Sequence, residues 1–171
     1  IMLDGGFTCP NRDGRVGQGG CSFCLCESFN PEYCRKHATI TGQLEAGKKF
    51  FEGKYTQMKY LAYFQAYSST YAPLEVLRLR YDEALAVEDV VGLVVATRPD
   101  CIDDDVLALL ASIRERGYSV AIELGCETFY DRTLVRVDRG HTSRQSLDAI
   151  HLCHRYAIPV TVHLMFGLPG E

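Results

Sequence analysis

Residues 91–124 read VGLVVATRPDCIDDDVLALLASIRERGYSVAIEL and place a helical pattern between two apolar runs of strand length. The runs 91–97 and 119–124 are almost continuously apolar, which is typical of strands in a parallel sheet covered by helices. The stretch between them opens on Asp103–Asp105 and ends at Gly117, residues that favour the start and the end of a helix. This segment therefore predicts a strand–helix–strand unit with parallel strands.

The same alternation continues in both directions along the chain. Further strands are expected at 60–65 and 160–166, with a short one ending near Asp4. Helical patterns are expected around 39–53, from Leu74 after Pro73 to Leu85, around Leu134 and Val137, and in a last segment that Thr142 or Ser143 could cap. Repeated strand–helix units imply right-handed connections and one parallel sheet. We expect a single α/β domain over 1–171, either an open doubly wound sheet or a partial barrel.

Composition limits the classes of function. The chain has 171 residues, 47% of them hydrophobic, and a net charge of −4 without any lysine–arginine block, so no broad nucleic-acid or membrane surface is indicated. Its scattered basic residues leave room for a local RNA contact. No signal peptide or membrane-length apolar run is visible. Eight cysteines in a chain with ample core residues favour metal-bound or free thiols in a reducing cytoplasm over disulfides.

Polar and glycine-rich residues follow each expected strand. Cys9 follows the first, and the later strands are followed by the segments 66–70, 97–100, 123–128 and 167–171. Function collects at the carboxyl ends of strands in parallel α/β folds, so we expect these segments to lie at one edge of the sheet. The chain begins at Ile1 and stops at Glu171 just after an apolar run, and we expect it to be a fragment of a longer protein.

Three cysteines mark that edge: Cys9, Cys21 and Cys24, in the segment CPNRDGRVGQGGCSFC. Three thiolates can bind three irons of a [4Fe–4S] cluster and leave the fourth iron open to a small molecule. The glycine-rich loop between Cys9 and Cys21 could fold around a cluster and donate backbone N–H groups to its sulfurs. It lacks the Gly-Lys-Ser/Thr signature of a phosphate-binding loop.

Other interpretations of these residues remain open. With Cys26, Cys34 or His37 as a further ligand, the three cysteines would form the zinc site of a zinc-stabilised α/β binding module. With Cys26 as fourth ligand they would hold the closed cluster of an iron–sulfur electron carrier.

Other polar residues could have structural rather than functional roles. Arg98 with Glu123, and Glu127 with Arg139, could be structural ion pairs. His163 could face the interior of the barrel or be a hydrogen-bonded core histidine.

An ordered set of sequence blocks carries a family resemblance. The blocks are GFTCPNRDG at 6–14, GGCSFC at 19–24, YFQAYSSTYAP at 63–73, GLVVATRPDC at 92–101, ELG at 123–125, RGHT at 139–142 and HLMFGLPGE at 163–171. Together they resemble the YhcC-like radical S-adenosylmethionine (SAM) proteins, relatives of the radical-SAM domain of the Elongator catalytic subunit. The resemblance covers nearly the whole chain.

The resemblance implies a radical-SAM partial (β/α)6 TIM-like barrel, here truncated after about the fifth strand and lacking the last strand and the C-terminal region. It implies a [4Fe–4S] cluster on Cys9, Cys21 and Cys24, with SAM bound to the fourth iron. One electron, from a donor such as flavodoxin or ferredoxin, would cleave SAM to a 5′-deoxyadenosyl radical that takes hydrogen from a substrate. The substrate is unknown, and a tRNA or other RNA base is suggested by kinship alone.

The resemblance also implies positions for SAM. Phe23 would pack near the adenine, and Gln65, Ser68 and Thr70 would hold the methionine amino group. Arg98 and Glu123 would face the ribose or carboxylate, and the backbone of Gly167 to Gly170 would approach the adenine. Two features depart from the common radical-SAM pattern: the cysteine spacing is not Cys-x3-Cys-x2-Cys, and Tyr67-Ser68-Ser69 replaces the usual Gly-Gly-Glu.

Overall fold

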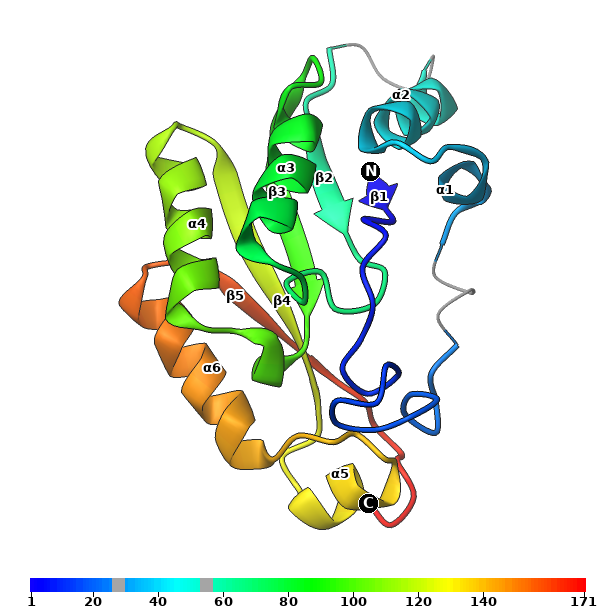
Figure 1. The fold of residues 1–171 in the computed structure, drawn as a ribbon, viewed down its shortest axis with the longest axis vertical. Helices are drawn as coiled ribbons and strands as arrows, with labels where there is room; N and C mark the ends of the chain where they lie inside the picture. Colours follow the sequence, from blue (N-terminus) through cyan, green and yellow to red (C-terminus); the bar gives the residue numbers. More distant parts are fainter. Residues whose placement is uncertain (26–29, 53–56) are drawn as a thin grey trace.

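The strands of this computed structural model, which describes residues 1–25, 30–52 and 57–171, form one parallel sheet (Figure 1). They are β1 (Met2–Leu3), β2 (Tyr60–Phe64), β3 (Val90–Thr97), β4 (Ser119–Glu127) and β5 (Val160–Leu164). Their spatial order is β1-β2-β3-β4-β5, the order of the chain. A doubly wound sheet would reverse its strand order at a switch point. The prediction of a partial TIM-like barrel is therefore confirmed, and the doubly wound alternative is excluded.

The predicted helices are present between the strands. They are α2 (Ile40–Phe51), α3 (Leu74–Leu85), α4 (Asp104–Glu115), α5 (Asp131–Arg136) and α6 (Ser143–Arg155). Asp103 caps α4 by accepting from the amide of Val106 at 2.8 Å. Thr142, rather than Ser143, caps α6 in a reciprocal capping box with Gln145. The short elements α1 (Glu32–Lys36) and η2 (Pro99–Cys101) were not predicted.

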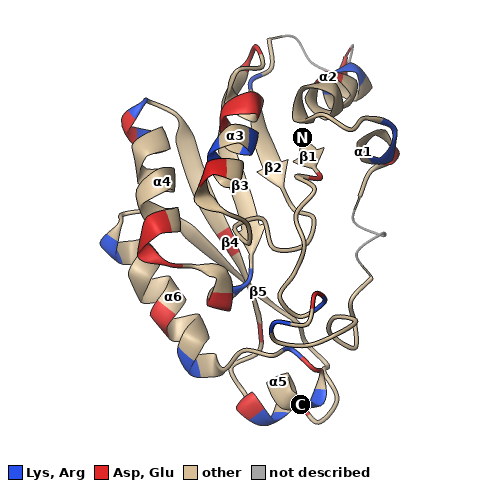
Figure 2. Cartoon of the chain, viewed as in Figure 1, with Lys and Arg blue, Asp and Glu red and all other residues tan. Residues whose placement is uncertain are grey.

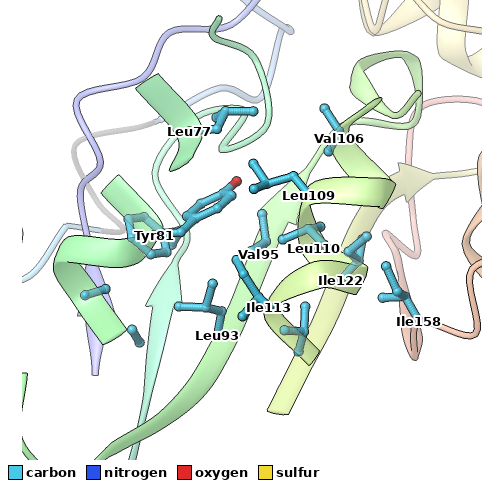
Figure 3. Close-up of a cluster of buried hydrophobic side chains, with 14 of the residues drawn as sticks. Leu77, Tyr81, Leu93, Val95, Val106, Leu109, Leu110, Ile113, Ile122 and Ile158 are labelled. Carbon is cyan, nitrogen blue, oxygen red and sulfur yellow. The ribbon is translucent and has the colours of Figure 1, made fainter. Parts of the chain in front are cut away.

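One face of the sheet packs against α3, α4 and α6, and this contact forms the hydrophobic core (Figures 1 and 3). Leu93 and Val95 of β3 and Ile122 of β4 are fully buried there. Tyr81 of α3 is also fully buried, and its hydroxyl donates to the carbonyl oxygen of Ser69 at 2.6 Å. That hydrogen bond ties the core to the segment that follows β2.

The opposite face of the sheet carries polar side chains. Side chains alternate between the two faces of a strand, so the residues next to the core positions point away from the helices. Register aligns Ala96 of β3 with Glu123 of β4 and Thr161 of β5, while Gly125 pairs with His163. Polar residues of several strands are thus brought to one side near the strand ends.

Charged residues are dispersed over the surface (Figure 2). Acidic residues lie along α3 and α4, on the helix side of the sheet. Along the described residues, no helix is both long and apolar enough to cross a membrane.

Candidate functional site

A cavity of about 650 Å³ lies at the carboxyl ends of the strands, and we call it the strand-end cavity. This volume falls within the range of small-molecule sites in proteins. Its lining comes from the segment that follows β1, from β2 and the segment after it, from the ends of β3, β4 and β5, and from the connection between α5 and α6. The lining residues are Cys9, Gly20, Cys21, Phe23, Cys24, Leu25, Tyr63, Gln65, Ala66, Tyr67, Ser68, Ala96, Thr97, Glu123, Gly125, Glu127, Arg139, His163, Leu164 and Met165. The structure thus brings the three predicted cysteines together with polar strand-end residues.

Residues 9–24, the cysteine loop, are folded by local backbone hydrogen bonds. The amide of Arg12 donates to the carbonyl of Cys9 at 2.8 Å, and the amide of Cys24 donates to that of Cys21 at 2.9 Å. Gly20 has a φ of +94°, a conformation that favours glycine. A Cβ at this position would lie 3.1 Å from Cys24 Sγ, so the glycine keeps the space beside that sulfur open.

Side-chain N–H groups surround the cysteine sulfurs. Asn11 Nδ2 and Arg139 Nη1 each lie 3.4 Å from Cys21 Sγ, and Arg12 Nη1 lies 3.5 Å from Cys24 Sγ. The sequence predicted backbone donors from the loop, not these side chains. Donors aimed at sulfur stabilise the negative charge of metal-bound thiolates, so this environment fits an iron–sulfur cluster.

The arrangement of the cysteines is compatible with a cluster. In the part of the chain that the structure describes, no three His, Cys, Asp or Glu side chains converge on a single metal ion. A [4Fe–4S] cluster does not require this, because each thiolate binds a different iron.

The predicted additional zinc ligands are placed elsewhere or not described. Cys34, on α1, does not line the cavity; its thiol donates to the carbonyl of Met2 at 3.5 Å, and burial raises its pKa to about 11. His37, just after α1, does not line the cavity either. Cys26 lies outside the described residues.

A hydrogen-bonded group of three side chains lies on the sheet side of the cavity. The Tyr63 hydroxyl donates to Glu123 Oε2, and His163 Nε2 lies 3.1 Å from the same oxygen. Burial and the neighbouring carboxylate raise the pKa of Tyr63, which keeps its hydroxyl protonated. His163 is half exposed and lines the cavity, which confirms the interior position over a core position. Tyr63 was not predicted as a site residue, because in the sequence it is one of several tyrosines that look like packing residues.

A register irregularity in β4 shapes the end of that strand. The pairing with β5 shifts between Gly125 and Glu127, and Glu127 has a φ of +66°. Such bulges re-aim side chains next to functional sites. Here Glu127 Oε1 lies 3.4 Å from Arg139 Nη2, so the predicted ion pair between these residues is confirmed.

The cavity that holds the cysteines is also lined by SAM-contact positions that the resemblance implies, among them Phe23, Gln65 and Ser68. Gln65 Oε1 and Ser68 Oγ are buried, and neither oxygen accepts a hydrogen bond from the described residues, while the Ser68 hydroxyl lies beside the Cys101 thiol. A buried polar atom without a partner is costly, so these two atoms are suited to receive a polar ligand group. Glu123 also lines the cavity.

Thr70, Arg98 and Gly167 do not line the cavity. Thr70 Oγ1 is 2.6 Å from both Thr97 Oγ1 and the carbonyl oxygen of Cys101. Gly167 is exposed beyond the end of β5, because the strand stops at Leu164 rather than continuing to Phe166.

Arg98 makes a buried ion pair with Asp100, at 2.9 and 3.0 Å, and donates to the carbonyl of Arg139 at 2.8 Å. The alternative of an Arg98–Glu123 ion pair is wrong. Each residue has a nearer partner, and Glu123 is engaged by Tyr63 and His163.

His141 is buried close to these residues. Burial, together with the positive charges of Arg139 and Arg98, lowers its pKa to about 4. Its ring is therefore neutral at pH 7.

Comparison with known proteins identifies the family. The model of the radical SAM superfamily matches residues 9–171, a range that contains the cysteine loop and every strand-end segment. The chain belongs to the radical SAM superfamily. Enzymes of this superfamily use a [4Fe–4S] cluster and SAM, which supports an enzymatic role for this chain.

Named relatives agree with this assignment. Protein YhcC of Escherichia coli strain K12 is 44% identical over 171 residues, which is all of this chain and 54% of that protein. A tRNA uridine(34) acetyltransferase of Methanocaldococcus jannaschii is 35% identical over 82 residues, 47% of this chain and 14% of that protein. The radical SAM chain spans about half the length of the full-coverage curated relatives it matches.

A solved structure shares the fold. The archaeal Elp3 of Methanocaldococcus infernus superposes on this chain with a TM-score of 0.60 at 19% identity. The alignment covers 77% of this chain and 34% of the Elp3 chain. At this identity the likeness shows the radical SAM fold alone.

Proposed function

We propose that Cys9, Cys21 and Cys24 hold a [4Fe–4S] cluster and that the strand-end cavity binds SAM on its open iron. The observation that supports this most directly is the position of the three cysteines in one cavity with two buried acceptor oxygens, Gln65 Oε1 and Ser68 Oγ. When bound, the reduced cluster would supply the electron that cleaves SAM to methionine and a 5′-deoxyadenosyl radical, which takes hydrogen from the substrate.

The lining residues have distinct roles in this proposal. Gln65 Oε1 and Ser68 Oγ would accept from the methionine amino group, which would give both buried oxygens a donor. Glu123, already fixed by Tyr63 and His163, accepts from a ribose hydroxyl. Phe23 provides an apolar surface for the adenine.

The route of the electron follows from the exposure of the cysteines. Cys9 and Cys21 are buried, whereas Cys24 is partly exposed. We infer that an electron donor such as flavodoxin or ferredoxin approaches the molecule on the Cys24 side.

Anaerobic reconstitution tests the cofactor proposal. Iron, sulfide and zinc are assayed, and the EPR spectrum of the reduced protein is recorded with and without SAM. About four irons per chain and a spectrum changed by SAM are expected from an open-iron cluster. Zinc without iron would refute the proposal. A cluster whose EPR spectrum does not change when SAM is added would indicate an electron carrier.

The electron-carrier alternative makes its own prediction about Cys26. A closed cluster would need Cys26 as fourth ligand, so Cys26→Ser would destroy it. In an open-iron site, Cys26→Ser retains the iron content and the response to SAM.

We infer an RNA base as the substrate class. Support comes from the partial similarity to a tRNA uridine(34) acetyltransferase. Tyr67 lines the cavity, and the guanidinium of Arg12 lies 5.7 Å from its ring centroid; such a pair offers a charge and a flat surface to a nucleotide.

Deuterium transfer distinguishes RNA from other substrates. The reduced enzyme is incubated with SAM and with tRNA whose bases and riboses carry deuterium. If hydrogen is taken from RNA, deuterium appears in 5′-deoxyadenosine. Formation of unlabelled 5′-deoxyadenosine at the same rate with and without tRNA would contradict an RNA substrate.

A further inference from the structure

Two N–H donors from distant parts of the chain converge on the sulfur of Cys21. Asn11 Nδ2 and Arg139 Nη1 both lie 3.4 Å from Sγ, and Arg139 is 118 residues away in sequence. Asn11 and Arg139 are 3% and 7% exposed, so water screens these contacts little. Hydrogen bonds and charges act more strongly in such surroundings than in bulk water.

The Arg139 guanidinium is fixed in place by several contacts. Its Nη2 donates to the carbonyl of Gly125 and forms the ion pair with Glu127, while its backbone carbonyl accepts from Arg98. A Cβ at Gly125 would lie 2.8 Å from Nη2, so this glycine makes room for the guanidinium. Asn11 is fixed as well, because its Nδ2 also donates to the carbonyl of Asp138. Both donors are therefore already oriented toward the sulfur.

We propose that Asn11 and Arg139 are positioning residues that raise the reduction potential of the cluster through Cys21, an inference that rests on the proposed function. Reduction adds one electron from the external donor, and therefore one negative charge, to the cluster and its thiolates. Hydrogen bonds to the sulfurs and a nearby cation stabilise the more negative state, which makes reduction easier. Arg12 contacts Cys24 on the exposed side, where solvent screens its charge.

A redox titration followed by EPR tests this role in the reconstituted protein. Arg139→Gln retains N–H donors but removes the charge, and Arg139→Lys retains the charge but loses the fork of the guanidinium. For Arg139→Gln we expect the ratio of reduced to oxidised cluster at a fixed potential to fall about tenfold, which is about 59 mV for one electron. Arg139→Lys should show a smaller fall. Arg136→Gln is the matched control, because Arg136 is exposed on α5 and donates to the carbonyl of Pro169. The reduction potential of the cluster in this variant should match that of the wild type.

Asn11→Leu gives a second, independent measurement. It removes the neutral donor with little change in side-chain size and leaves the Arg139 guanidinium in place, so the potential should fall by less than in Arg139→Gln. If Arg139→Gln does not assemble a cluster, Asn11→Leu decides the question.

Iron, sulfide and the response to SAM are measured on every variant, which separates the two possible failures. Unchanged potentials in variants with full, SAM-responsive clusters would overturn the role of Asn11 and Arg139 and leave the proposed function standing. Absence of a four-iron cluster from the wild-type protein would refute the proposed function and this inference with it.

Discussion

Replacing Cys21 by alanine is expected to abolish the cluster, with iron falling from about four per chain to near zero and SAM cleavage falling to background. Cys21 is buried in the strand-end cavity, and its sulfur receives two side-chain donors that fix its position. Alanine removes one of three protein ligands and leaves a second iron without a thiolate. Iron and sulfide assays after anaerobic reconstitution measure the loss directly.

Cys153→Ala is the matched control for this experiment. Cys153 is fully buried on α6 and does not line the cavity, and burial raises the pKa of its thiol to about 11. Its removal should leave the iron content and the SAM response unchanged. Equal loss of iron in both variants would mean that alanine disturbs the fold, and full retention of iron in Cys21→Ala would contradict the assignment of Cys21 as a ligand.

The sheet and most helices could be predicted because their signals are local. The strands are continuous apolar runs, and α4 and α6 begin at capping residues that the structure uses as caps. The short α1 and η2 were missed because each lacks a capping side chain and is too short to show a periodic pattern. Strand ends were predicted only to within a few residues. The end of β4 was missed because the strand continues through an irregularity that apolar patterning does not reveal.

The position of the site could also be predicted, since all carboxyl ends of a parallel sheet lie at one edge. The partners of the individual polar side chains could not be predicted in this way. The resemblance implied that Arg98 faces SAM, but Asp100, two residues later, forms an ion pair with it. The contact between Arg139 and Cys21 joins residues 118 positions apart, and no local pattern encodes such a pair. Strand order fixes where a residue lies, while side-chain direction depends on packing.

The ion pair of Arg98 with Asp100 gives the largest expected effect on stability. Their side chains are 3% and 8% exposed, and the contact is bidentate. Asp100→Ala leaves the buried guanidinium without its counter-charge, so we expect the free energy of unfolding to fall by about 3–5 kcal/mol. Urea unfolding measures this as a lower midpoint with an unchanged slope.

Exposure, rather than the count of ion pairs, decides this outcome. Arg144 and Asp148 form a pair at 3.0 Å with side chains 81% and 53% exposed, so Asp148→Ala should cost at most about 1 kcal/mol. A further variant tests the cause, because replacing both buried partners, with Arg98→Met and Asp100→Leu, removes the isolated charge. That double variant should be more stable than Asp100→Ala alone. If it is less stable, the contact of Arg98 with the backbone of Arg139, which only the double variant removes, contributes more to stability than the unpaired charge costs.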